Sequence, residues 1–284
     1  MSLLDRMLTL DRRWIFLVVA VAVTVPLFLH LEQKIEITQE SRGVFEGLSG
    51  LPAGARVIMA CDFDPGSAAE VQPMAIAFLK FALSHRLRVI IMGLWPQGPM
   101  QADLALRDAL RDPAVAAVAP QYGIDYINLG FQSGNEVVIQ RMGSDIPMVF
   151  PRDSRGQAIA EFPIMENVRN FDAVAYVFNL SAGYPGTVEW VQFAGDRFHA
   201  RIGSGTTAVS APLYYTYFPK QVTGVLGGMK GASEFEELTG FKGKGTRFML
   251  SQSFAHIVMI LFVVLGNIAF FASRRRKRAG ETAA

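Results

Sequence analysis

The chain contains only one cysteine and four histidines among its 284 residues. A single cysteine, Cys61, cannot form an intrachain disulfide. It ends a short apolar segment, and that setting favours a buried, inert thiol over a reactive one. The one cysteine and the scattered histidines lack the spacing of a zinc-binding set. We therefore expect neither a structural disulfide nor a zinc site.

Charged residues are also scarce, at 18% of the chain, and two long apolar runs account for much of the deficit. These runs cover 14–31 and 254–272, and each is long enough to cross a hydrocarbon core about 30 Å thick as a helix. No A-x-A-like cleavage site follows the first run, which favours an uncleaved anchor over a signal peptide. The residues between the runs suffice for one domain with a sizeable core.

The apolar runs divide the chain into five predicted parts. They are a cytoplasmic N-terminus (1–13), a transmembrane helix (14–31), a central domain (32–250), a second transmembrane helix (254–272) and a basic cytoplasmic tail (273–284). Arg12 and Arg13 precede the first run, and five basic residues follow the second. The positive-inside bias therefore predicts a two-pass protein of the cell (plasma or inner) membrane, with both termini cytoplasmic and the central domain extracytoplasmic.

The central part lacks an excess of positive charge, because the basic residues that give the chain its net +2 lie in the C-terminal tail. A domain of mixed charge has no electrostatic reason to bind nucleic acid. The expected partners are the lipid bilayer and either other membrane proteins or a second copy of the chain. Asn267 lies deep in the second apolar run, where an amide needs a hydrogen-bond partner, and so it is predicted to face a partner in the membrane.

Short apolar segments alternate with helical patterns along the central part. Strands are expected at 56–62, 87–94, 125–131, 172–179 and 197–203. Continuously apolar strands are typical of parallel sheets that are buried on both faces. The alternation predicts an α/β domain, a Rossmann-like, doubly wound and mostly parallel sheet of about five strands.

Helices are expected at 67–85, 100–111, 133–142, 184–194 and 219–238. Ser67 with Glu70, and Ser133 with Glu136, have the spacing of capping boxes. The glycines of the last helix indicate either close packing against a neighbour or a turn. Residues 146–163 fit neither pattern and are expected to form a long loop or a small hairpin, and residues 240–245 are expected to form a flexible linker.

In an open α/β sheet, ligands bind beyond the carboxyl ends of the strands. This rule selects, as candidate ligand-binding residues, Trp95, Ser133, Asn135, Ser204 and Thr206. The small hydroxyl-rich segment 203–207 is of a kind that cradles anions with backbone N–H groups, although it lacks the lysine and spacing of a P-loop. No G-x-G-x-x-G follows the first strand, so we expect no dinucleotide site.

Asp62 and Asp64 are the candidate catalytic residues. Two carboxylates this close can hold a divalent cation, or can divide nucleophile and acid roles because neighbouring carboxylates push their pKa values apart. The Asp-x-Asp resembles that of the haloacid-dehalogenase phosphatases, but that pattern continues with Thr or Val where this chain has Gly66, and no later lysine and acidic pair is evident. The structural alternative is that Asp64 begins a turn while Asp62 caps backbone donors.

A serine nucleophile is not favoured. Ser204 or Ser210 would need a positioned base, and the central part has only His85 and His199. His199 is expected inside the fifth strand in a structural role.

Two hypotheses of function follow from these patterns. The first is a non-enzymatic subunit, with no cofactor, that binds a partner protein or a small ligand within a membrane complex. The second is a hydrolase or phosphoryl-transfer enzyme that uses a divalent cation at Asp62 and Asp64.

Overall fold

The computed structural model describes residues 11–28 and 34–281, with side chains described to residue 274. The chain divides into two compact units. One unit is Ile35–Thr246, called the central unit below, and the other comprises the terminal segments Met1–Lys34 and Arg247–Ala284. We describe the two units separately.

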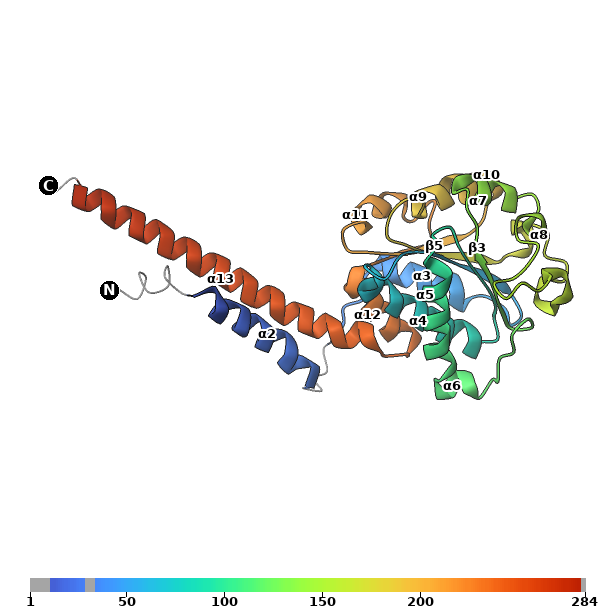
Figure 1. Ribbon diagram of the computed structural model, residues 1–284, viewed down its shortest axis with the longest axis horizontal. Coiled ribbons are helices and arrows are strands. Elements are labelled where there is room, and N and C mark those ends of the chain that lie inside the picture. Colours follow the sequence, from blue (N-terminus) through green and yellow to red (C-terminus); the bar gives the residue numbers. More distant parts are fainter. Residues whose placement is uncertain (1–10, 29–33, 282–284) are drawn as a thin grey trace. The chain divides into compact units, whose positions relative to one another are not determined.

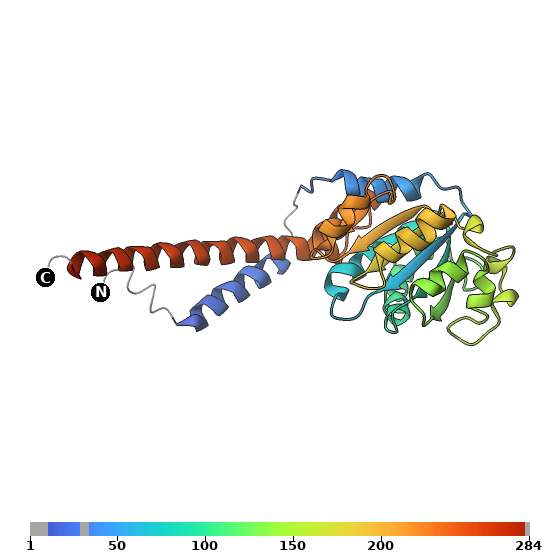
Figure 2. The same ribbon diagram turned by 90° about the horizontal axis from the view of Figure 1, so that it is seen from above.

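The terminal segments contain two helices, α2 (Arg12–Phe28) and α13 (Lys244–Glu281). Over Lys244–Arg274, α13 is long and apolar enough to cross a membrane, judged by its length and composition (Figure 2). It is the one such helix among the described residues. α2 has 17 residues, and residues 29–31 of the predicted first span lie outside the described residues. The first span therefore stays a prediction.

The central unit is built around one parallel sheet (Figure 1). Its six strands have the order β3-β2-β1-β4-β5-β6. Their bounds are β1 (Arg56–Asp62), β2 (Arg88–Gly93), β3 (Tyr126–Phe131), β4 (Tyr176–Ser181), β5 (Ile202–Thr206) and β6 (Val225–Gly227). The predicted Rossmann-like α/β architecture with a mostly parallel sheet is confirmed.

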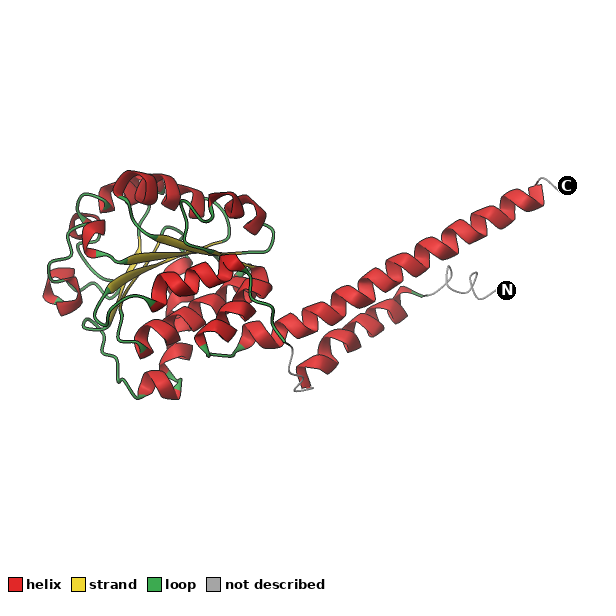
Figure 3. Ribbon diagram, turned by 180° about the vertical axis from the view of Figure 1, so that it is seen from behind, coloured by secondary structure: helices red, strands yellow, loops and turns green. Residues whose placement is uncertain are grey.

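Helices cover both faces of the sheet (Figures 1 and 3). One face carries α3 (Gln39–Ser49), α4 (Ala68–Ser84), α5 (Gly98–Leu110) and α12 (Gly228–Thr239), and the other carries α7 (Glu136–Met142), α9 (Thr187–Trp190) and α11 (Ala211–Tyr214). Short helices complete the connections: α6 (Pro113–Ala116), α8 (Ile146–Val149) and α10 (Asp196–Phe198), which follows the π-helical segment η4 (Val191–Gly195).

Side chains of β1 alternate between two core layers. Val57, Met59 and Cys61 pack in the layer beneath α4, whereas Ile58 and Ala60 pack in the layer beneath α7 and α9. Because both faces are covered, nearly every strand residue must be apolar or satisfied by an internal hydrogen bond. This explains why the continuous apolar segments of the sequence were informative about β1 and β2.

The structure has six strands where about five were expected. The sixth, β6, lies inside the predicted helix 219–238, and only α12 from Gly228 onward is helical there. Three residues are too few to produce a periodic pattern. β6 is recognisable as a strand only through its pairing with β5, in which Ser204 lies opposite Val225.

The fifth strand also lies further along the chain than predicted, at Ile202–Thr206 instead of 197–203. His199 lies outside it, in a left-handed conformation with φ of 57° directly after α10, which corrects its predicted place in a strand. β5 contains Gly203 and Gly205, which weaken a strand signal in the sequence. Packing leaves no room for a larger residue here, because a Cβ at Gly203 would overlap the hydroxyl of Tyr176.

Both predicted capping boxes are wrong. The hydroxyl of Ser67 donates to Asp64 and caps no backbone group of α4. The carboxylate of Glu70 instead accepts from the backbone N–H of Ala208 at 2.7 Å. α7 begins at Glu136, so Asn135, not Ser133, stands at its N-cap. At the starts of α4 and α7, a tertiary or turn contact therefore takes the place of the capping box that the spacing suggested.

Residues 146–163 contain α8 and a small hairpin in which Arg152 and Ala158 form an antiparallel bridge. The buried Asp153 holds the hairpin, because its carboxylate accepts from the Tyr122 hydroxyl at 2.6 Å and from the backbone N–H groups of Arg155 and Gln157. The hairpin alternative from the sequence is therefore correct.

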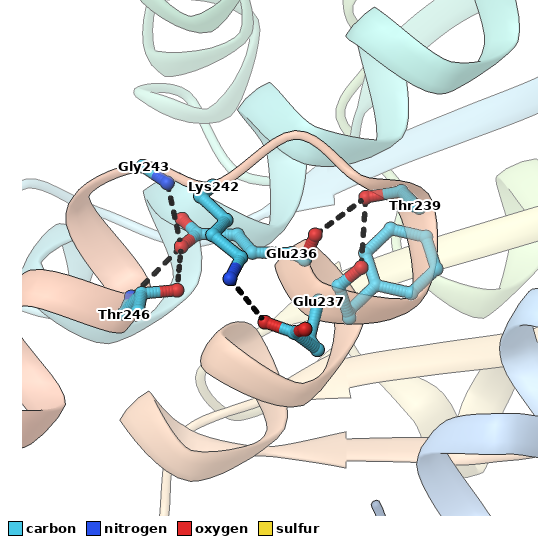
Figure 4. A network of polar contacts seen from close by, with 7 residues as sticks. Glu236, Glu237, Thr239, Lys242, Gly243 and Thr246 are labelled. Atoms are coloured by element: carbon cyan, nitrogen blue, oxygen red, sulfur yellow. Dashed lines mark hydrogen bonds and ion pairs between the residues drawn. The ribbon is translucent and has the colours of Figure 1, made fainter. Parts of the chain in front are cut away.

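The segment 240–245 was expected to be a flexible linker, and this prediction is wrong. The buried carboxylate of Glu236 on α12 accepts from the backbone N–H groups of Gly243 and Thr246 and from the Thr246 hydroxyl, at 2.7–2.9 Å (Figure 4). It also accepts from the backbone N–H of Gly245 at 2.8 Å. A carboxylate that satisfies N–H groups at the first turn of a helix acts as its N-terminal cap. Glu236 thus fixes the start of α13 to the central unit.

A second carboxylate on α12 holds the other end of the central unit. Glu234 accepts from the backbone N–H and hydroxyl of Thr38, at 3.1 and 2.6 Å, and pairs with Lys230 at 3.1 Å. The glycines of this segment serve both predicted roles: a Cβ at Gly231 would lie 2.6 Å from the backbone of Leu226, and Gly228 has φ of 58° where β6 passes into α12.

Candidate functional site

The strand order creates a switch point between β1 and β4. From β1 the chain runs outward to β2 and β3, whereas from β4 it runs outward in the other direction to β5 and β6. In sheets of this kind the crevice beyond the carboxyl ends of the two central strands is the usual ligand site. Asp62, the last residue of β1, occupies that position.

Asp62 is completely buried, and three donors saturate its carboxylate. Its Oδ1 accepts from the backbone N–H of Leu94 at 2.7 Å. Its Oδ2 accepts from Nδ2 of Asn179 at 2.8 Å and from Nε1 of Trp190 at 3.0 Å. The donors come from the end of β2, from β4 and from α9, so the carboxylate ties three elements together.

Burial raises the pKa of Asp62 to about 7, because desolvation disfavours the charged form. The hydrogen bonds from Leu94, Trp190 and Asn179 oppose this shift by stabilising the carboxylate, and the negative charge of Glu189 adds to it. Asp62 is therefore poised to change its protonation state near neutral pH.

The hydrogen-bond network continues from Asp62 across β4 to β5. The Thr187 hydroxyl donates to Oδ1 of Asn179 at 3.0 Å and lies 2.7 Å from the hydroxyl of Ser204. Since a hydroxyl has one hydrogen, Ser204 is the donor in the second contact. The Thr206 hydroxyl donates to the carbonyl oxygen of Ser181 at 2.8 Å.

Ser204 and Thr206, two of the predicted ligand-binding residues, are therefore completely buried and bonded to other residues of the network. The hydroxyl of Ser204 contacts the hydroxyl of Thr187 at 2.7 Å.

Trp95, a third predicted residue, is half-buried in the loop after β2. Its Nε1 donates to the carbonyl oxygen of Pro185 at 3.0 Å, which links the loop after β2 to the loop after β4. Its ring lies against Gly183, where an added Cβ would be 3.3 Å from the indole. The loops at the switch point are thus joined by the indole of Trp95, and the carboxylate of Asp62 lies buried in a hydrogen-bonded network.

Asp64 does not share the environment of Asp62. It is partly exposed and accepts from the backbone N–H and the hydroxyl of Ser67, both at 3.0 Å, and these hydrogen bonds lower its pKa. Residues 65–67 form a turn, as in the structural alternative from the sequence. Among the side chains that the structure describes, no group of three or more His, Cys, Asp or Glu residues is placed to hold a metal ion.

Ser133 and Asn135 lie at the rim, away from the buried network. Ser133 is exposed and lines a surface depression of about 590 Å³ together with Arg141 and Arg197. Asn135 is half-buried with φ of 50° at the start of α7. The structure therefore brings Asp62, Ser204 and Thr206 into one region and leaves the other polar candidates at the surface.

Sequence reasoning missed Asn179, Thr187 and Trp190. Asn179 had a recognisable signal, because an amide in the middle of an apolar strand must find an internal partner. Thr187 and Trp190 follow β4 in a short helix, and nothing in their local pattern indicates that they turn toward Asp62.

Asn267, predicted to face a partner in the membrane, is exposed on α13. Its side-chain amide donates to the carbonyl oxygen of Val263 at 3.0 Å, one turn earlier in the same helix. This contact satisfies one of its two amide hydrogens and leaves the carbonyl of the side chain available.

No protein-family model, curated protein or solved structure matches this chain.

Proposed function

We propose that this chain is a non-enzymatic component of a membrane protein complex, in which the central unit is an anchored module that binds a partner. One observation carries the proposal: the position where Rossmann-like sheets bind small ligands is filled by Asp62 and its three donors. Among the described residues, three buried side-chain atoms lack a hydrogen-bond partner, and none belongs to this network. The buried side-chain atoms of this network are therefore all paired within the chain.

The membrane arrangement is part of the proposal. α13 supplies one anchor and the apolar run 14–31 a second, with both termini in the cytoplasm and the central unit on the extracytoplasmic face. The five basic residues after Ala272 support this orientation. The amide of Asn267 on α13 supports contact with another helix in the bilayer.

The alternative is a cation-dependent hydrolase or phosphoryl-transfer enzyme, and one observation favours it. A buried carboxyl with a pKa near 7 is typical of catalytic acids and bases. Against it, Asp62 is enclosed while Asp64 is held in a surface turn, so the two carboxylates do not converge on a common opening.

The size of the native assembly and the response of the chain to added divalent cation test the proposal. The full chain, extracted from its own membranes in mild detergent, should migrate as an assembly larger than the 31.2 kDa monomer. Mg²⁺ or Mn²⁺ titrated calorimetrically into the full chain should give no binding heat. A lone monomer that hydrolyses p-nitrophenyl phosphate with either cation, and loses this activity on Asp64→Asn, would establish the enzyme instead.

A further inference from the structure

Five loops, each taken together with the start of the helix that follows it, lie side by side at the carboxyl edge of the sheet. In spatial order they follow β3, β2, β1, β4 and β5, at residues 131–137, 94–101, 62–70, 181–190 and 206–213. Neighbouring strands are about 4.8 Å apart, so the loops form a row about 20 Å wide. We call this row the carboxyl-edge surface.

The carboxyl-edge surface is tied together by contacts between its loops. Trp95 donates to Pro185, which joins the loops after β2 and β4. The Tyr184 hydroxyl donates to Glu136 at 2.6 Å, which joins the loops after β4 and β3. The bond between Ala208 and Glu70 joins the loops after β5 and β1. A surface held in place in this way loses little conformational entropy on binding.

Large apolar side chains are exposed along this surface. Of the ten that the central unit exposes, six belong to these loops: Met100, Phe131, Val137, Tyr184, Val209 and Leu213. Val209 is 90% exposed and Tyr184 60% exposed. Single exposed apolar residues are ordinary, but their concentration on one edge is typical of an interaction site.

The charges on the same loops have one sign. None of the chain's 27 lysines and arginines lies in the five segments, whereas Asp64, Glu70, Glu136 and Glu189 do. Carboxylates in the same segments as exposed apolar side chains favour a partner that combines lysines or arginines with apolar side chains. Their negative charge disfavours nucleic acid, anionic lipid and an identical edge from a second copy.

We propose that the carboxyl-edge surface is the docking site for a different protein whose contacting face combines apolar side chains with lysine or arginine. This inference rests on the proposed function and adds where the module binds and what it recognises. The closed switch point fits this role, because Trp95 and the network beneath it give the surface a rigid floor.

Site-specific photocrosslinking in native membranes tests the assignment. The full chain carries p-benzoylphenylalanine in place of Val209 or, as a matched control, in place of Ile124, an exposed residue before β3 at the opposite edge of the sheet. We expect one defined adduct with another protein from Val209 and none from Ile124. Mass spectrometry of the linked peptide should place it on a face of the partner that carries lysine or arginine.

Reversing the charge of acidic residues on the carboxyl-edge surface is the second test of the assignment. Glu136→Lys combined with Asp64→Lys should lower the adduct yield about tenfold, which corresponds to about 1.4 kcal/mol. Glu46→Lys, which reverses an exposed acidic residue on α3, should leave the yield unchanged. An unaltered near-ultraviolet circular dichroism spectrum shows that each variant is folded.

Several results would overturn the assignment: an adduct of twice the chain's mass, adducts with lipid alone, a yield from Val209 no higher than from Ile124, or a yield insensitive to charge reversal. The native assembly separates this failure from failure of the proposed function. If the assembly persists while Val209 gives no adduct, only the docking surface is wrong. If no assembly larger than the monomer exists, the proposed function is wrong as well.

Discussion

Asp62 makes the stability of the central unit depend on pH. Its pKa is about 7 in the folded protein and 3.8 as the ordinary value in an unfolded chain. Between these values the folded state binds the proton more tightly, so the unfolding free energy falls as pH rises from about 4 and levels off above about 7. The slope approaches about 1.4 kcal/mol per pH unit, which gives a total on the order of 4 kcal/mol.

Asp62→Asn removes this titration while keeping the shape of the side chain. The amide oxygen of the new side chain can still accept from Asn179 and Trp190, but its NH₂ group then faces the N–H of Leu94. Losing that bond costs about 1–3 kcal/mol. We therefore expect the variant to be less stable than the wild type at pH 5. The difference in stability between the variant and the wild type should be smaller at pH 8, where Asp62 of the wild type is a buried carboxylate anion.

Thermal unfolding of the full chain in detergent, followed by near-ultraviolet circular dichroism at pH 5 and pH 8, measures this difference. The indole N–H resonance of Trp190 reports the same titration directly, because that group donates to Asp62. It should shift with a midpoint near pH 7 in the wild type and should not titrate in the variant. A wild type and a variant with parallel pH dependence, or a Trp190 resonance that is constant from pH 5 to 8, would refute the reasoning.

Three further predictions concern the scaffold. Glu236→Ala should lower the unfolding free energy by at least about 3 kcal/mol, because four donors at the start of α13 lose their acceptor. Glu237→Ala on the exposed side should lower it by under about 0.5 kcal/mol. Chemical denaturation measures both values. Gly98→Ala should reduce the yield of folded protein, since its Cβ would overlap the carbonyl oxygen of Cys61, while Gly50→Ala, with its nearest neighbour at 3.7 Å, should be tolerated. The Cys61 thiol, whose pKa is raised by burial, should react with a maleimide only after denaturation, and rapid labelling of the native protein would contradict its buried position.

The sequence was most informative where burial is uniform. β1, β2 and β3 lie close to their predicted positions because both of their faces are covered and nearly all of their residues are apolar. β5 was misplaced because its residues are small, and β6 was missed because it has only three residues. The packing of Gly203 against Tyr176 and the pairing of Ser204 with Val225 are tertiary features.

The location of the candidate site at the carboxyl edge of the sheet was also predictable from the sequence. Whether the site is open or enclosed was not. Strand–helix alternation implies a carboxyl edge, and Asp62, Trp95, Ser204 and Thr206 all lie there. Whether that edge opens into a cleft depends on partners distant in the sequence. Asn179 and Trp190 lie 117 and 128 residues from Asp62, and no local pattern encodes their convergence.

By itself, the sequence determined the class of fold and the apolar helix near the C-terminus, because both follow from hydrophobic patterns that act over a few residues or one uninterrupted run. The tertiary structure alone decided that the central carboxylate is enclosed and that Glu234 and Glu236 hold the two ends of the central unit. It also decided that the loops after the strands form one acidic and apolar surface. These features depend on hydrogen bonds between distant segments, and such bonds exist only once the chain has folded.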